Sequence, residues 1–175
     1  SSRWKYTRTF EGNVMANRPV DLLIAYRVIK MLVTPFDKQP AFKNGIIDEK
    51  GKVLKKYKTL KTEKERKSYT LLHRFVFNLK RILQRVGLGS KLGSFGVALA
   101  LLIKEDKRYA QHQQLIEQTV IKYLKDNNLY EDILNESREI PEFDTDDQVF
   151  CTCFGVDVYE KDGELISEYE YAKTL

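Results

Sequence analysis

The chain has 175 residues, of which 42% are hydrophobic and 31% are charged. This composition supports one core of ordinary size and excludes a disordered or collagen-like chain, since there are only 9 Gly and 4 Pro. The net charge of +5 is unevenly divided: residues 1–130 hold 27 basic and 11 acidic residues, whereas residues 131–175 hold 3 basic and 14 acidic residues. This division predicts that the acidic end folds back on the basic body, or that the two ends face different partners.

Residues 1–19 are predicted to form an N-terminal arm. Trp4, Tyr6 and Phe10 alternate there with polar residues, as the side chains of a short strand do. An aromatic, polar arm of this kind suits contact with a neighbouring molecule. We therefore expect Trp4 and Tyr6 to contact a partner.

A first helix is predicted from Val20 to about Val33, because Pro19 suits a first helical turn and Pro35 ends the pattern. The segment is apolar on almost every side, which is typical of a helix that is buried on most sides. A mid-chain hairpin is predicted next, with Gly51 in its tight loop between residues 46–47 and 53–54.

A second helix is predicted to begin at Thr62, which forms a capping-box pattern with Glu65, and to end at Gly87. A third helix follows over about residues 91–103, where small residues are expected to permit close helix–helix approach. The longest apolar run, Phe95–Ile103, has nine residues. A membrane-spanning helix needs about twenty, so this run predicts a core helix and no membrane partner.

The last third of the chain is predicted to contain a fourth helix over about residues 107–127, a short helix over 130–137, an acidic loop and a second hairpin. This hairpin joins residues 148–159 to 164–171 through an Asp-Gly turn, which is a strong local hairpin signal. Its first strand is expected to be able to extend the sheet of another chain.

The fold class that follows is α+β. We expect a mainly helical single domain of about four helices, with a mid-chain hairpin and a C-terminal β-hairpin. Residues 1–19 form the arm, 20–140 the helical core domain, and 141–175 the acidic loop and hairpin.

No catalytic, cofactor-binding or metal-binding residue is predicted. Cys151 and Cys153 are interpreted as neighbouring buried thiols, because a disulfide between such close residues is strained. His73 lies near an apolar helix face and is interpreted as a partly buried imidazole, whereas His112 lies in a polar stretch and is expected to face solvent. The glycines between residues 87 and 96 are interpreted as a helix cap and packing positions, because they do not follow a strand as a phosphate-binding loop would.

The strongest charge feature is the segment Lys50–Lys67, with nine basic residues against two Glu. Three interpretations stand open: contact with nucleic acid, a dock for an acidic protein surface, or a solvated loop. For the first, Tyr57 and Tyr69 are candidates to stack on bases. The candidate contact residues of this segment are Lys52, Lys55, Lys56, Lys58, Lys61, Lys64, Arg66 and Lys67.

Four blocks of sequence, at residues 24–36, 45–48, 69–81 and 90–105, follow one another in an order that resembles a small family of uncharacterised proteins of tailed, T4-like bacteriophages. The resemblance spans about residues 22–105, and no activity or site residue comes with it. It implies a non-enzymatic structural or assembly protein, located in the virion and, during assembly, in the host cytoplasm. The expected partners are other virion proteins and copies of the chain itself. The alternative hypothesis, which rests on the basic segment Lys50–Lys67, is that the chain is a small accessory protein that binds nucleic acid.

Overall fold

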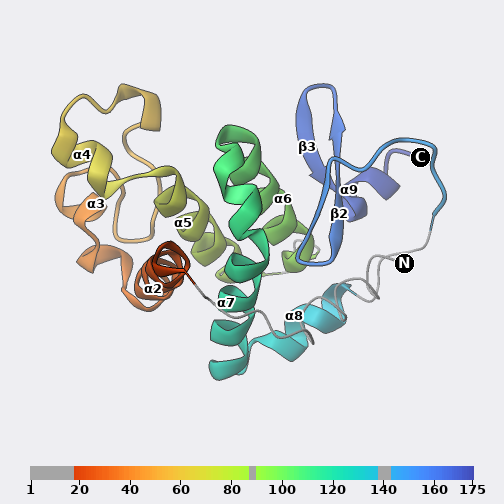
Figure 1. The fold of residues 1–175 in the computed structure, drawn as a ribbon, viewed down its shortest axis with the longest axis horizontal. Helices are drawn as coiled ribbons and strands as arrows, with labels where there is room; N and C mark the ends of the chain where they lie inside the picture. Colours follow the sequence, from red (N-terminus) through yellow and green to blue (C-terminus); the bar gives the residue numbers. More distant parts are fainter. Residues whose placement is uncertain (1–17, 87–89, 138–142) are drawn as a thin grey trace.

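The computed structural model describes residues 18–86, 90–137 and 143–175, and their arrangement is shown in Figure 1. The α+β class is confirmed, but the described ranges contain eight α-helices rather than about four. The helices are α2 (Pro19–Val33), α3 (Pro40–Lys43), α4 (Glu63–Ser68), α5 (Leu71–Leu83), α6 (Lys91–Glu105), α7 (Gln113–Asp126), α8 (Tyr130–Ser137) and α9 (Glu168–Ala172). The strands are β1 (Cys151–Cys153), β2 (Val156–Lys161) and β3 (Glu164–Ser167), and the 3-10 turns are η1 (Phe36–Lys38), η2 (Tyr57–Thr59) and η3 (Lys107–His112).

The helix predicted to run unbroken from Thr62 is divided into α4 and α5. Its start is confirmed: the Thr62 hydroxyl accepts a hydrogen bond from the Glu65 amide at 3.1 Å. The chain then leaves helical geometry at Tyr69, and the hydroxyl of Thr70 caps α5 by accepting from the amide of His73 at 3.3 Å. This second capping box has an imidazole where the usual pattern has Glu or Gln, so the sequence pattern missed it. The predicted fourth helix is similarly divided, into η3 and α7.

One hydrophobic cluster, here called the main core, joins α2, α5, α6, α7, α8 and the sheet. The helix α6 lies at the centre of the main core, and the three-stranded sheet covers one side of α6. A Cβ at Gly96 would lie 3.0 Å from the Cys153 carbonyl oxygen, and one at Gly93 would lie 3.2 Å from Ser167. The two glycines of α6 therefore permit close approach of the sheet and of Ser167. α6 also packs on α5, as the expectation of helix–helix contact requires.

The C-terminal sheet is antiparallel with strand order β1-β2-β3. The Asp-Gly turn is confirmed: Asp162 and Gly163 have φ of 54° and 81° and join β2 to β3. The expectation of one strand over residues 148–159 is wrong, because a second tight turn at Phe154 and Gly155, with φ of 55° and 71°, divides it into β1 and β2. The chain also ends in the helix α9, not in a strand that reaches Tyr171.

The edge strand β1 is already engaged with α7. The Thr152 carbonyl accepts a hydrogen bond from Gln113 Nε2 at 2.7 Å, and the Phe154 amide donates to Glu117 at 3.0 Å. A continuous strand that could extend a neighbour's sheet, as expected from the sequence, is therefore not formed here.

Residues 36–69, here called the small lobe, lie at one end of the molecule, while the sheet lies at the other (Figure 1). The lobe surrounds a second cluster of buried residues: Phe36, Ala41, Ile46, Ile47, Leu60, Tyr69 and, from α5, Phe77. The predicted mid-chain hairpin is reduced to a single antiparallel bridge between Ile47 and Val53. Gly51 does have the positive φ expected of the tight loop, at 82°.

The helix α2 is not buried on most sides, as its composition had predicted. Its inner face is formed by Ile24, Val28, Met31 and Leu32, which pack into the main core. Apolar residues on its other side are exposed. Among the described elements, α2 packs chiefly on α5 and α7 through its inner face, so its other face is left exposed.

The acidic C-terminal segment does fold back on the body of the protein: β2 and β3 pack on α6, and Lys104 forms an ion pair with Glu160. The predicted arm residues Trp4, Tyr6 and Phe10 lie outside the described residues, as do Gly87 and Gly89.

Candidate functional site

The predicted contact residues of the small lobe form what is here called the Lys-rich surface: Lys52, Lys55, Lys56, Lys58, Lys61, Lys64, Arg66 and Lys67. All eight residues are exposed. They begin at Lys52, just before the bridge residue Val53, continue through η2 and end on α4. The segment contributes few buried residues, chiefly Leu60 and Tyr69, so most of its side chains remain in solvent.

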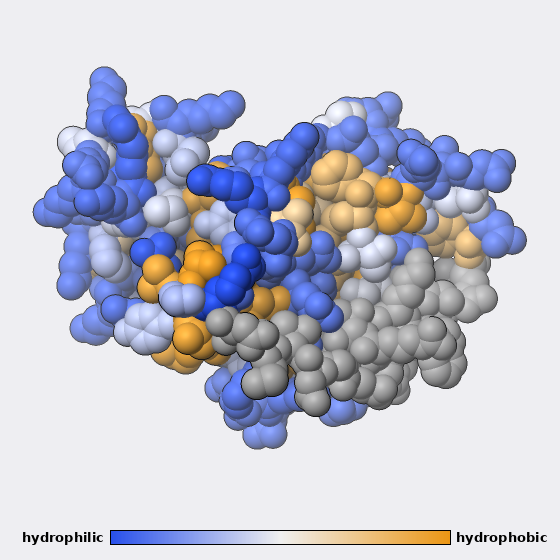
Figure 2. All heavy atoms as spheres, viewed as in Figure 1, coloured by the Kyte–Doolittle hydropathy of each residue, from blue (hydrophilic) through white to orange (hydrophobic). Residues whose placement is uncertain are grey.

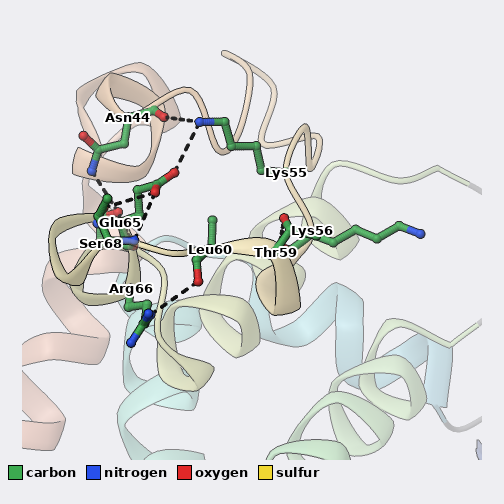
Figure 3. A network of polar contacts seen from close by, with 9 residues as sticks. Asn44, Lys55, Lys56, Thr59, Leu60, Glu65, Arg66 and Ser68 are labelled. Atoms are coloured by element: carbon green, nitrogen blue, oxygen red, sulfur yellow. Dashed lines mark hydrogen bonds and ion pairs between the residues drawn. The ribbon is translucent and has the colours of Figure 1, made fainter.

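Two of the eight cations hold the backbone of the lobe in place (Figure 3). Lys55 Nζ lies 3.3 Å from Glu65 Oε2 and 3.4 Å from the Asn44 carbonyl oxygen. The hydrogen bond from Lys55 lowers the pKa of the Glu65 carboxyl below its usual value. The Arg66 guanidinium donates to the carbonyl oxygens of Leu60, at 3.3 Å, and of Lys61. Both cations therefore stabilise the lobe as well as contributing charge to its surface.

A third cation, Lys67, forms an ion pair with Glu63 one turn earlier in α4, at 2.9 Å. The two side chains are 76% and 80% exposed, so water screens the pair and it contributes little to stability. Lys67 can therefore exchange this partner for another anion at small cost.

The other five side chains, those of Lys52, Lys56, Lys58, Lys61 and Lys64, have no carboxylate within ion-pair distance among the residues that the structure describes. The side chain of Lys56 points away from the network of polar contacts (Figure 3). Like charges gathered without counter-charges attract polyanions and acidic surfaces, with a range of about 8–10 Å at moderate salt.

A cleft of about 1010 Å³ opens beside this surface, between η2 and the helices α5 and α6. Lys56 and Lys58 line one side of it, and Arg74 and Arg81 of α5 line another. Among the described residues that line it, Glu105 is the single carboxylate. The cleft thus extends the positive charge of the Lys-rich surface toward the main core.

The two arginines of the cleft are fixed by neighbouring groups. Arg74 Nη1 lies 2.9 Å from Glu105 Oε2, and the Arg74 guanidinium carbon lies 4.9 Å from the centre of the Tyr57 ring. Arg81 Nη1 donates to the Gly51 carbonyl oxygen at 2.8 Å. The cleft therefore presents two arginines on α5, each held by a hydrogen-bonding partner, opposite two exposed lysines on the small lobe.

The aromatic residues proposed for base stacking differ in accessibility. Tyr69 is buried, and its ring lies 6.0 Å from that of Phe77, so the expectation that it stacks on bases is wrong. Tyr69 lies between α4 and α5, and its ring packs into the cluster of the small lobe. Tyr57 is exposed and lines the cleft, with Arg74 over its ring.

The two histidines have structural partners. His73 is partly buried, as predicted, and its Nδ1 lies 2.8 Å from the Thr70 hydroxyl. Burial, reinforced by the charge of Arg27, lowers its pKa to about 4. The expectation that His112 faces solvent is wrong: the last residue of η3 is turned back onto α2, where His112 Nδ1 lies 2.9 Å from Asp21 Oδ1.

Glu117 is a buried acid that the sequence reasoning missed. Its carboxyl group accepts hydrogen bonds from the Phe154 amide at 3.0 Å and from Gln113 Nε2 at 3.1 Å. Burial raises its pKa to about 7. The sequence does contain a signal for this burial. Glu117 follows Ile116 and lies three residues before Val120, which places its side chain on the inward face of α7.

The cysteines lie on one face of β1, as predicted, with their Sγ atoms 2.9 Å apart. Cys153 is buried and Cys151 is partly buried. The hydrogen bond from Cys151, together with burial, raises the pKa of the Cys153 thiol. No group of three or more potential metal ligands gathers within the described ranges.

Comparison with known proteins gives no match: no family model, no curated protein and no solved structure is similar to this chain. Within residues 18–86, 90–137 and 143–175, none of the helices combines the length and the apolar character needed to cross a membrane.

Proposed function

We propose that this protein is a non-enzymatic assembly component of a tailed-phage particle, and that it binds an acidic surface of a neighbouring virion protein through the Lys-rich surface. The observation that carries this proposal is the set of five exposed lysines without a carboxylate partner among the described residues, beside a cleft lined by further cations. The resemblance of residues 22–105 to a phage family supplies the biological setting.

The electrostatics favour a macromolecular partner. Exposed ammonium groups within one lobe repel one another, and an acidic surface that faces several of them at once relieves that repulsion. Lys55 and Arg66 hold the backbone beneath them, so the lobe need not reorganise when a partner binds. Such a surface speeds association and selects partners by charge more than it adds affinity.

Three described groups that could perform acid–base chemistry are engaged away from the cleft. His73 belongs to a helix cap, His112 is paired with Asp21, and Glu117 supports the turn after β1. None of these three residues lines the cleft, and Glu105, which does, is paired with Arg74. This arrangement supports a binding role for the surface.

A second candidate function, binding of nucleic acid, is favoured by the cleft. Lys56, Lys58 and Arg74 are placed to contact phosphates, and the exposed ring of Tyr57 is placed to contact a base. The two candidates differ in how they respond to salt. Binding to a phosphate backbone weakens steeply with salt, with a slope that reports the number of phosphates engaged.

The test compares two double charge reversals. Lys56→Glu with Lys58→Glu changes the Lys-rich surface, and Lys107→Glu with Lys125→Glu changes two exposed lysines outside the small lobe. Mass spectrometry of purified particles measures incorporation, and fluorescence anisotropy with single-stranded DNA measures nucleic-acid binding over a range of salt concentrations. We expect the first variant to lose incorporation at least tenfold and the second to retain it.

The outcomes separate the candidates. A chain that is absent from purified particles but binds DNA with a steep salt slope, which the first variant reduces by about two, supports nucleic-acid binding. Equal behaviour of the two variants in both measurements rejects the Lys-rich surface as the binding site.

A further inference from the structure

A second surface, distinct from the Lys-rich surface, lies on α2. Five of its apolar side chains are exposed: Val20 45%, Leu22 59%, Leu23 47%, Tyr26 62% and Val33 63%. Figure 2 shows hydrophobic side chains at the surface of the region where α2 lies in Figure 1. These five residues are here called the α2 stripe.

The α2 stripe is a true helix face. Four of its residues, Leu22, Leu23, Tyr26 and Val33, lie on one side of the helix together with Pro19 and Lys30, because these six positions are spaced by three and four residues or adjoin one another. Val20 lies on the flank of this face, seven residues before Arg27. The opposite side carries Ile24, Val28 and Met31, which are buried in the main core. A helix that is apolar all round is the pattern of a helix covered on both sides, and among the described residues nothing covers the second side of α2.

We propose that the α2 stripe is covered by the α2 stripe of a second copy of this chain, in a two-fold symmetric, antiparallel helix pair. The exposed face runs from Pro19 to Val33, so Tyr26 lies at its midpoint. An antiparallel pair centred on Tyr26 places Pro19 across from Val33 of the other copy and Leu22 across from Lys30. Every apolar residue of the face thereby meets a counterpart, with no overhang at either end.

Lys30 fits this arrangement. Its Nζ lies 5.9 Å from the centre of the Tyr26 ring in the same helix, so the stem of the side chain already lies along the apolar face. Lysine stems cover apolar surface while the ammonium group stays in water. In the pair, this stem would cover Leu22 of the second copy and the ammonium group would remain at the rim.

The area of the α2 stripe is sufficient for a reversible dimer. A half-exposed large side chain shows roughly 100 Å² of surface, so the five residues show about 500 Å² in each copy. A symmetric pair would then bury about 1,000 Å² in total, which is at the lower limit for a specific interface. We therefore expect a dimer that dissociates on dilution, not an obligate one.

The charges at the edge of the α2 stripe predict an unusual salt dependence. Arg27 is exposed one residue after the midpoint, so the two copies of Arg27 come together on the same flank of the pair. Salt screens this repulsion and does not weaken apolar burial. Dimerisation should therefore become stronger with salt, whereas binding through the Lys-rich surface should become weaker, so that the two proposals can fail separately.

Sedimentation velocity of the full chain over a wide concentration range, at low and at high salt, tests the proposal. We expect the average mass to rise from one copy toward two, at lower concentration when salt is high. Tyr26→Glu should remain monomeric throughout, because it places two carboxylates at the symmetry axis. Val86→Glu, at another exposed apolar position, should dimerise like the unchanged chain.

A third variant keeps the test independent of any loss of folding. Arg27→Gln removes the like-charge contact, and we expect it to tighten the dimer severalfold at low salt and to abolish the salt dependence. A chain that stays monomeric at every concentration overturns the proposal and assigns the α2 stripe to another occupant, either residues 1–17 or an acidic partner protein. A dimer that persists in Tyr26→Glu also overturns it.

Discussion

The main core and the small lobe are held together in different ways. The main core consists of aliphatic and aromatic side chains from long helices, and a sheet covers its central helix. The small lobe contains only two short helices, and seven buried residues form its cluster. Much of its backbone therefore lacks the internal hydrogen bonds of a regular element, and other groups must satisfy those polar atoms.

Side chains supply those hydrogen bonds. Within the lobe, Lys55 Nζ donates to the carbonyl oxygen of Asn44 at 3.4 Å. Gln39 Nε2 attaches the lobe to the end of α2 by donating to the carbonyl oxygens of Met31 and Thr34, at 3.1 and 3.0 Å. Arg81 of α5 donates to the carbonyl of Gly51. The small lobe, which carries the Lys-rich surface, is therefore itself held by a cation, the Arg81 guanidinium. Such side-chain hydrogen bonds can keep an irregular backbone, and the Lys-rich surface on it, in one conformation.

The largest expected effect is a loss of stability when one buried aromatic ring is removed from each region, and it distinguishes the main core from the small lobe. Phe77→Ala empties the small-lobe cluster, where the Phe77 ring lies 5.6 Å from Phe36, and Phe95→Ala empties the main core beside Phe154. Each should lower the free energy of unfolding by about 3–5 kcal/mol in denaturant titrations. Hydrogen exchange should show that Phe77→Ala exposes the amides of residues 46–54 before those of α6, whereas Phe95→Ala exposes both together. Equal exposure in the two variants would contradict the division into two regions.

The next effect concerns two titratable groups whose pKa is shifted by burial, Glu117 on α7 beside the sheet and His73 in the first turn of α5. Glu117 has a pKa of about 7 in the folded protein and an ordinary value of 4.5, so the unfolded chain binds fewer protons between these values and stability falls as pH rises. His73 has a folded pKa of about 4 and an ordinary value of 6.5, so stability rises with pH between these values. Each contribution is about 3 kcal/mol. They should nearly cancel in the unchanged chain.

Single variants should reveal the two slopes. Glu117→Gln should leave a stability that rises between pH 4 and 6.5, and His73→Gln, which keeps a capping side chain, should leave one that falls between pH 4.5 and 7. Urea titrations at several pH values measure both. A Glu117→Gln profile as flat as that of the unchanged chain would show that Glu117 is not protonated in the fold.

A smaller effect is expected in the tight loop of the small lobe. A Cβ at Gly51 would lie 2.4 Å from Phe36 Cζ, at a φ of 82°. Gly51→Ala should therefore destabilise the protein by about 2–3 kcal/mol. Gly45→Ala is the matched control, because Gly45 has a φ of 71° with open space around the position, and it should cost only about 1 kcal/mol. Thermal unfolding of both variants measures the difference, and equal losses would exclude the contact with Phe36 as its cause.

The smallest expected effect lies on the Lys-rich surface itself. Lys67→Ala removes an exposed ion pair with Glu63, so the free energy of unfolding should change by less than about 0.5 kcal/mol. Denaturant titration measures this change. A loss above about 1 kcal/mol would show that the pair also supports the fold of the small lobe.

Local signals in the sequence predicted the local features. The Thr62 capping box, the extent of α2 and the Asp162-Gly163 turn follow from residues close together in the chain. The Phe154-Gly155 turn could not be predicted in this way. Phe154 adopts a φ of 55° there, and its ring packs 5.7 Å from that of Phe95, so a distant contact holds it in an unfavourable conformation.

The candidate site was predictable only in its exposed half. Lysines in an irregular, hydrophilic segment stay in solvent, so the sequence indicated the Lys-rich surface. The cleft depends on Arg74 and Arg81, which lie on α5, outside the small lobe. No local sequence pattern indicates that these arginines face the Lys-rich segment. The sequence did not predict the exposure of the α2 stripe. An apolar composition shows that a helix face tends to be buried, but it does not show whether the same chain or another molecule covers that face.

Lys80 of α5 has a consequence for how the chain refolds. Its ammonium group lies 4.5 Å from the centre of the Phe36 ring and donates to the carbonyl oxygens of Thr34 and of Met31, the latter at 3.1 Å and 49 residues away. The last turn of α2 is thus completed by a residue from a later helix. Its amides should acquire protection during refolding at the same moment as those of α5, in one kinetic step and not ahead of it.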